Sequence, residues 1–472
     1  MFSSQARSNA MATLTRASFQ TAYNIQSRSL DDGILGVSRN GNLHKTLDEL
    51  RQLPPGEREG VLTNLSNAAL NELASDVNAA GILGAGGLSH DEKRTLFDTL
   101  AESSTGKDLA RLASAFDSRD DTQLLAESVA NKGSLQSRSA YIEAMPPRTA
   151  DNDYGHSFAL GGAMTEKVDK DAKAILTVLN SFDTGTSEGR ASFDQAINSL
   201  PQSVMNNVVE AGVSETTYTS QGSYSVFYRT ETVNKLLDRA AKSGEAAVKG
   251  KIFSSAADVV SSMRAVQNAL LVGSAANPNI QDITGRMTTL MNTDPRGITD
   301  SLKEDRYGTR LCTYVSEVLR NNQEDGAKVL GEQLAQLKGA GTGQSPIYFF
   351  EQTDPGTLGT PYYKNAETLG YYAGALRASV DKLSADATKT GSIVKSILNA
   401  GIGAADLGPT GSVAPVLTDA MIDEAVNAAN NNRTELAQKL EDLAVPIDSN
   451  GKYYRGPATA AFNAIAAKVR AQ

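Results

Sequence analysis

Apolar residues recur along most of the chain at the three- and four-residue spacing of an amphipathic helix. This spacing predicts many helices of about 10–20 residues, separated by Gly, Pro and Asn. The clearest apolar faces are Ile280, Ile283, Met287 and Leu290; Leu311, Tyr314, Val315, Val318 and Leu319; and Leu369, Tyr372, Leu376, Val380 and Leu383. The sequence therefore predicts a mainly α protein, built as a multi-helix array of short helices.

Signals for helix starts agree with this periodicity. Ser89 and Glu92 have the spacing of a capping box, and Asn432 with Glu435 repeats that spacing with Asn in place of Ser. The dipeptide 294–295, Asp followed by Pro, places a good N-cap before a proline at the first helical position. We expect helices to begin at these three places.

One segment, 215–230, has a different period. Tyr224, Val226 and Tyr228 alternate with Ser223, Ser225 and Phe227, after β-branched residues and a Gln-Gly pair. Alternation of this kind predicts a β-hairpin. Because an isolated pair of strands is marginally stable in water, we expect the hairpin to pack on helices. We interpret it as a structural flap, with a recognition arm as the alternative.

Two stretches rich in Gly, Pro and polar residues, 146–162 and 339–360, are the best candidate domain boundaries. They divide the chain into a polar N-terminal tail at 1–40, a helical domain at 41–145, a helical domain with the hairpin at 163–338, and a C-terminal helical domain at 345–472. No fixed repeat of about 20–50 residues is evident. The middle and last parts have similar short helices, so a shared core is an alternative.

Composition narrows the class of protein. The 472 residues are 40% hydrophobic and include 40 glycines, which is enough for a sizeable core and excludes wholesale disorder. The net charge of −9 argues against nucleic acid as the main partner, because phosphate binding needs a basic face. A single cysteine, Cys312, excludes a disulfide scaffold and a cysteine-rich metal site.

The first 30 residues are polar and free of acid. They contain Arg7, Arg16 and Arg28 with many Ser, Thr, Asn and Gln residues. No continuous apolar run of about 7–15 residues is present, so we expect no Sec signal peptide. The stretch resembles the uncleaved N-terminus of bacterial type III secreted proteins. A mitochondrial-type presequence and a frayed arm of no special purpose remain alternatives.

The segment Gly391–Met421 is the nearest approach to a membrane-spanning sequence. Lys395, Asp406 and Asp419 interrupt it, and two prolines break it. Each apolar arm has only about 10–14 residues, below the roughly 17–25 of a spanning helix. We expect a buried hairpin of small residues and no membrane insertion.

The best candidate for chemistry is the cluster Asp151, Asp153 and His156. Two carboxylates and an imidazole this close have the groups needed to hold a divalent metal or to perform acid–base catalysis. However, the spacing differs from that of an EF-hand loop, and the polar, Gly-containing setting is typical of a surface loop. We therefore expect no metal or cofactor, and we keep an enzymatic site near this loop and the hairpin as the alternative.

Other residues offer weaker candidates. Gly81–Gly87 and Gly339–Gly343 are glycine-rich, but each follows a predicted helix rather than a strand, so they indicate helix connections and not phosphate-binding loops. Cys312 lies beside an apolar helix face and is expected to be a small buried hydrophobe. His44 and His90 are expected on the surface.

Three segments resemble a known class of protein. GILGAGGLSHDEKRTLFDTLAESSTGKDLARLASAF (81–116), KNAETLGYYAGALRASVDKLSADA (364–387) and YRGPATAAFNAIAAKV (454–469) are similar to helical blocks of large secreted effectors and toxin-associated proteins of plant-associated proteobacteria. The resemblance covers about a third of the chain. It implies a delivery or scaffold role and no catalytic motif.

These observations predict a bacterial secreted effector or translocator-like protein, delivered by a type III or contact-dependent secretion system. We expect it to leave the bacterium without a Sec signal peptide, to bind the secretion machinery or a chaperone through its N-terminal tail, and to act on an unidentified target-cell protein by interaction rather than catalysis. Two alternatives remain: an enzyme effector with a site near residues 151–156, and a non-exported cytoplasmic helical scaffold.

Overall fold

The computed structural model describes residues 17–25, 37–78, 88–145, 166–218, 224–269, 277–338, 354–355, 361–362, 364–383, 393, 396–397, 445 and 456–470. Almost all of these residues are helical, which confirms the mainly α prediction. The chain forms two compact units, residues 1–244 and 245–472. No helix in the described part of the chain is long and apolar enough to cross a membrane.

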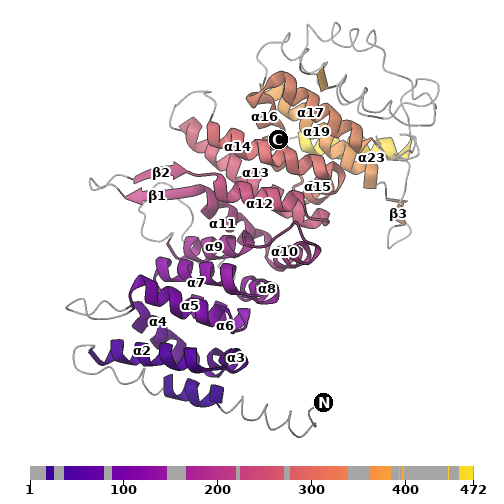
Figure 1. Ribbon diagram of the computed structural model, residues 1–472. Helices are drawn as coiled ribbons and strands as arrows, with labels where there is room; N and C mark the ends of the chain where they lie inside the picture. Colours follow the sequence, from indigo (N-terminus) through magenta and orange to yellow (C-terminus); the bar gives the residue numbers. More distant parts are fainter. Residues whose placement is uncertain are drawn as a thin grey trace. The chain divides into compact units, whose positions relative to one another are not determined.

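The first unit is a stack of short helices (Figure 1). Its helices are α2 (Val37–Gln52), α3 (Pro55–Asn64), α4 (Asn67–Asn78), α5 (His90–Ala101), α6 (Gly106–Ala115), α7 (Arg119–Lys132), α8 (Leu135–Ala144), α9 (Glu166–Leu179), α10 (Ser187–Ser199), α11 (Gln202–Val213) and α12 (Glu231–Ala241). From α4 to α9, each helix packs mainly on the helix two places further along: α4, α6, α8 and α10 form one layer, and α5, α7, α9 and α11 form the other.

Ser and Thr caps set the starts of many of these helices. The predicted capping box is present at α5: the Ser89 hydroxyl accepts the amide of Glu92, and the Glu92 carboxylate accepts the amide of Ser89. A Ser or Thr side chain also accepts an amide at the starts of α6, α7, α8 and α10. Each cap satisfies a backbone donor that has no partner within its helix.

Close backbone contacts and aromatic pairs hold the layers of the first unit together. A Cβ atom at Gly106 would lie 1.9 Å from the carbonyl oxygen of Ser137, so only glycine lets α6 approach α8 this closely. In the core, the rings of Phe97 and Phe116 meet edge to face with centroids 5.4 Å apart, a preferred geometry for aromatic pairs. Backbone packing and apolar burial together define the stack.

Two strands follow α11: β1 (Ser214–Tyr218) and β2 (Tyr224–Tyr228). They pair antiparallel, with Ser214 opposite Tyr228 and Tyr218 opposite Tyr224. They lie in the region where the sequence predicts a hairpin, and β1 directly follows α11 in the chain. The residues between the strands, 219–223, lie outside the described part of the chain.

Part of the predicted N-terminal tail belongs to the folded unit. Residues 17–25 are helical, and Ala22 and Ile25 are buried. The hydroxyl of Ser18 donates to the carbonyl oxygen of Glu57, on α3, at 2.6 Å. Ala22 and Ile25 are three residues apart and so share one face of this helix, and Ser18 attaches the helix to α3.

The second unit contains α13 (Ala246–Ala269), α14 (Pro278–Thr293), α15 (Pro295–Ser301), the short 3₁₀ helix η3 (Leu302–Glu304), α16 (Thr309–Asn321), α17 (Gln323–Leu337), α19 (Lys364–Leu383) and α23 (Pro457–Arg470). A two-residue pair, β3 (Asp354–Pro355) and β4 (Pro361–Tyr362), was not predicted from the sequence. The predicted start at Pro295 is confirmed, because the Asp294 side chain accepts the amide of Gly297. The Asn432 start lies outside the described residues.

The apolar faces predicted for α14 and α16 are buried, as are Leu369, Tyr372, Leu376 and Val380 of the face predicted for α19; the side chain of Leu383 lies outside the described part of the chain. Between them lies a buried polar group: the Gln333 side-chain amide donates to the Asn292 side chain and the Tyr314 hydroxyl, and Tyr372 donates to Gln333. Each polar group thus has a partner, which limits the cost of its burial.

The division into two units differs from the predicted tail and three domains. α9 packs on α7 and α8 across the expected boundary at 146–162, and α19 packs on α16 and α17 across the one at 339–360. Glycine- and proline-rich segments therefore connect helices within one core at both places. The division falls instead between α12 and α13.

Candidate functional site

The residues predicted to carry chemistry lie outside the described part of the chain. This applies to Asp151, Asp153 and His156, and equally to Gly81–Gly87 and Gly339–Gly343. Of Gly391–Met421, only positions 393, 396 and 397 are described. The enzymatic alternative and the buried small-residue hairpin therefore stay predictions.

The other candidate residues are described, and they lie where the sequence predicts. His44 and His90 are surface residues on α2 and α5, with side chains 45% and 71% exposed. Cys312 is buried on α16, and its thiol lies 3.9 Å from the Ala375 carbonyl oxygen. Burial raises the pKa of the Cys312 thiol to about 11, so the group stays protonated at neutral pH. Cys312 thus behaves as a small hydrophobe.

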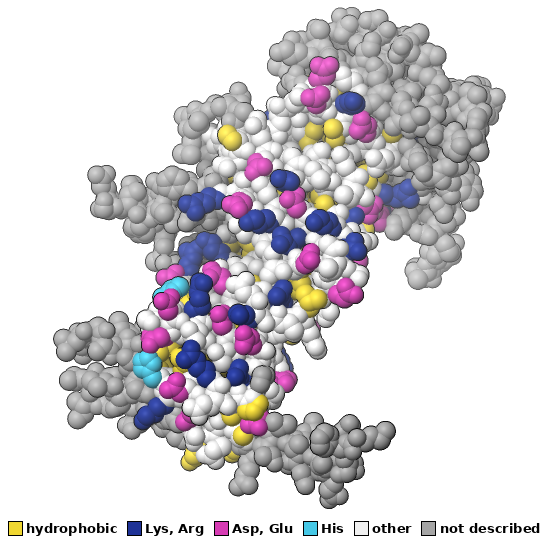
Figure 2. Space-filling view, viewed as in Figure 1, with side chains coloured by type: hydrophobic (Ala, Val, Ile, Leu, Met, Phe, Trp, Pro, Cys, Tyr) yellow, Lys and Arg dark blue, Asp and Glu magenta, His cyan; other side chains and the backbone are white. Residues whose placement is uncertain are grey.

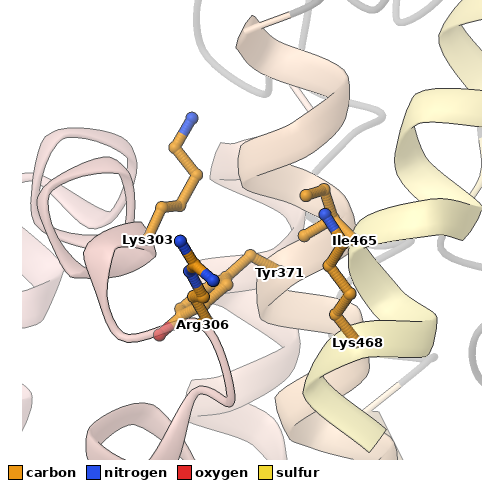
Figure 3. Close-up of a pocket in the computed structure, with 5 residues that line it drawn as sticks. All are labelled: Lys303, Arg306, Tyr371, Ile465 and Lys468. Carbon is orange, nitrogen blue, oxygen red and sulfur yellow. The ribbon is translucent and has the colours of Figure 1, made fainter.

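A pocket of about 410 Å³ lies in the second unit (Figure 3). The described residues that line it are Lys303, Arg306, Tyr371, Ile465 and Lys468. Lys303 and Arg306 extend from one side, and Ile465 and Lys468 from α23 on the other, with Tyr371 of α19 between them. We call this set of five residues the basic pocket, because three cations and no acidic residue appear among them.

The three cations of the basic pocket differ in their surroundings. The side chain of Lys303 is mostly buried. Its charge is neutralised, because its Nζ lies 2.6 Å from Asp300 Oδ1 and 3.7 Å from Glu367 Oε2. Arg306 and Lys468 are exposed, and no carboxylate of the described residues forms an ion pair with either. The positive charge of the pocket that no carboxylate of the described residues neutralises therefore comes from these last two side chains.

Arg306 lies in a turn that a side chain of α19, Tyr371, stabilises through hydrogen bonds to the backbone. The Tyr371 hydroxyl lies 2.9 Å from the carbonyl oxygens of both Leu302 and Asp305, which bracket the turn. Burial, together with the Asp305 carboxylate, raises the pKa of Tyr371 above its ordinary value, so the hydroxyl keeps its proton and remains a donor. At the end of the turn, Gly308 has φ of 65°, a left-handed conformation that favours glycine.

The position of Lys468 depends on how closely α23 approaches α19. A Cβ atom at Gly370 would lie 2.4 Å from the Phe462 carbonyl oxygen, and one at Gly374 would lie 2.9 Å from that of Ala466. The two glycines are four residues apart and share one face of α19, so the backbones of the two helices touch there.

Chemically, the basic pocket is suited to binding a small anion. A guanidinium and an ammonium bind phosphate or carboxylate oxygens through charge-assisted hydrogen bonds. A volume of about 410 Å³ is within the range of small-molecule sites. No group of three or more His, Cys, Asp and Glu side chains that would hold a metal ion occurs in the part of the chain that the structure describes.

Sequence reasoning did not find the basic pocket. Lys303 and Arg306 are more than 150 residues from Lys468, and each looks like an ordinary surface cation. The only feature near these residues that the sequence displays is Gly308, which suggests a turn beside Arg306 but does not indicate a pocket. No family model, curated protein or solved structure matches the chain.

Proposed function

We propose that this chain is a bacterial secreted effector or translocator-like protein that acts by binding a protein of the target cell. The observation that carries the proposal is the two-layer stack of helices in the first unit. Stacks of this kind present long, continuous surfaces, and many of them serve as protein-binding scaffolds. The resemblance of three segments to secreted effectors agrees with this role.

The surface of the stack has the character of a protein-binding face. Arg94 and Glu127 form an ion pair at 3.4 Å between α5 and α7, and Lys132 of α7 pairs at 3.5 Å with Glu102, the residue that follows α5. On the face shown in Figure 2, acidic and basic side chains are intermixed over the region where α2 to α8 lie. Mixed charge of this kind favours recognition of a protein surface with its own charge pattern.

Delivery is the second part of the proposal. The acid-poor N-terminus would bind the secretion machinery or a chaperone, and the chain would leave without a Sec signal peptide. Because Ser18 bonds to Glu57 on α3 and Ala22 and Ile25 are buried, the test removes residues 1–16 and keeps the helix at 17–25. Deletion of 1–16 should abolish export to the medium from a type III-competent bacterium while the deleted chain remains folded in the cell. Undiminished export would contradict delivery through this segment.

Interaction is tested separately with a matched pair of variants on α6. Leu109 is fully buried and Lys107 is exposed. Leu109→Asp should disrupt the stack and remove cross-links to target-cell proteins, whereas Lys107→Asp should keep the fold. Cross-links that survive Leu109→Asp unchanged would overturn the proposal that the stack binds the partner.

A further inference from the structure

We infer that the basic pocket of the second unit binds a phosphomonoester group, carried either by a soluble metabolite or by a lipid headgroup. This site is independent of the partner surface proposed for the first unit. Three features of the pocket support this assignment: the residues that line it, the ion pairing of its cations, and the backbone contacts that position those cations.

Two of the three cations that line the pocket have no anionic partner among the described residues. Lys303 has two carboxylate partners, Asp300 and Glu367, so it contributes little free charge. Arg306 and Lys468 have no carboxylate partner among the described residues, yet both line the same cavity. Two like charges around one cavity repel each other, and a bound dianion would convert this repulsion into attraction.

The backbone holds the two free cations on opposite walls. Arg306 lies in a turn that Tyr371 holds through the Leu302 and Asp305 carbonyl oxygens. The turn ends at Gly308, where a Cβ atom would lie 2.7 Å from Val469, next to Lys468. The turn and α23 are therefore in direct contact, and the separation of Arg306 from Lys468 depends on that contact. Such preorganisation lowers the entropic cost of binding a ligand.

The lining favours phosphate attached to an organic group over a bare inorganic ion. Arg306 has a planar guanidinium that matches two phosphate oxygens, and Lys468 supplies a point charge. Ile465 gives one wall an apolar surface. The cavity of about 410 Å³ is several times larger than a phosphate ion needs, since one water molecule occupies about 30 Å³ of liquid. The remaining space suits the carbon skeleton of the ligand.

The test measures binding to the full-length chain in three arms: inorganic phosphate, inositol trisphosphate, and phosphatidylcholine vesicles with and without phosphatidic acid. We expect saturable binding in the second or third arm, tighter than binding of inorganic phosphate. Binding of inositol trisphosphate alone indicates a soluble ligand, and binding only to vesicles that contain phosphatidic acid indicates a lipid headgroup. The absence of saturable binding in both arms overturns the inference.

Matched variants separate the pocket from general electrostatics. Arg306→Gln and Lys468→Gln should each weaken binding by about tenfold, which is typical of one charged hydrogen bond. Lys328→Gln removes an exposed cation of α17 in the same unit, outside the pocket, and should leave the affinity unchanged. Equal loss in all three variants, or no loss in the first two, would overturn the inference. All three substitutions are at exposed side chains, so the fold should survive.

Discussion

Replacement of Gly370 by alanine should destabilise the second unit, although alanine is the better helix former. Gly370 lies inside α19, where the change from glycine to alanine ordinarily stabilises a helix by about 0.5–1 kcal/mol. At this position the new Cβ would lie 2.4 Å from the Phe462 carbonyl oxygen and 2.9 Å from the Phe462 Cα. Both atoms belong to the backbone of α23, so no side-chain rotation relieves the clash.

The size of the effect follows from how far α23 must move. A normal contact requires a shift of roughly 0.5–1 Å, which forfeits about a quarter to a half of the dispersion attraction at the displaced contacts. Overpacking of this kind costs about 1–3 kcal/mol. After the gain in helix propensity is subtracted, Gly370→Ala should lower the free energy of unfolding of the second unit by about 0.5–2 kcal/mol.

Gly285 provides the matched control. It lies in α14 of the same unit, it is exposed, and a Cβ atom placed on it would meet nothing within 4 Å. Gly285→Ala should therefore stabilise the unit by about 0.5–1 kcal/mol. The same chemical change should thus have opposite signs at two helical glycines.

Urea denaturation followed by far-ultraviolet circular dichroism measures both variants. Tyrosine fluorescence is the second probe, because the chain has no tryptophan. The slope of the transition should stay constant while its midpoint moves. If Gly370→Ala is as stable as the wild type or more stable, while Gly285→Ala gains stability as expected, then α19 and α23 do not pack through Gly370 and the reasoning is refuted.

Three further changes test other contacts. Glu317 is 2% exposed and accepts hydrogen bonds from Arg264 and Arg320. Glu317→Gln should lower the free energy of urea unfolding by about 3 kcal/mol, because it leaves the buried charge of Arg264 unpaired. Removal of the exposed partner by Arg320→Gln should cost under about 1 kcal/mol. The raised pKa of Cys312 means that its stabilising protonated form is lost as the pH rises from about 9 to about 11; the denaturation midpoint should fall over that range, and less steeply in Cys312→Ala. Ser89→Ala should cost about 1 kcal/mol in the unfolding of the first unit, and an unchanged midpoint would argue against the cap.

The sequence was sufficient for the helices whose periodicity and caps are both local. The apolar face Leu311 to Leu319, the box at Ser89 and the start at Pro295 depend on residues within a few positions of each other, so they can be read without the fold. The N-terminal tail was harder, because polar composition concealed Ala22 and Ile25, which are buried. Two apolar residues are enough to anchor a short helix that composition alone assigns to a tail.

The stacked array escaped sequence analysis for a physical reason. The helices of one layer, α5, α7, α9 and α11, start at residues 90, 119, 166 and 202, so their separations are 29, 47 and 36 residues. Connections of unequal length are tolerated because loop closure costs little for each added residue. A search for a fixed period therefore fails, although the packing of each helix on the one two places ahead is regular.

The basic pocket could not be predicted because its residues converge only through tertiary structure. The closeness of Lys468 to Arg306 depends on the backbone contact of α19 with α23, and that contact depends on Gly370 and Gly374. Two glycines four residues apart are common in sequences, and nothing near them indicates which other helix will pack against them. Domain boundaries are hard to predict for a related reason, because a glycine-rich segment indicates a turn and not whether the helices on either side share a core.

The order of packing in the first unit also has a consequence for how it comes apart under force. Because α4 to α11 each contact mainly their immediate neighbours in the stack, the free energy of the unit is close to a sum of nearest-neighbour steps. A pull applied at one end should therefore peel off helices in sequence, each step breaking one small interface, instead of breaking the whole core at once. The same short-range contacts favour rapid refolding. The first unit should therefore unfold and refold one helix at a time, starting from an end of the stack.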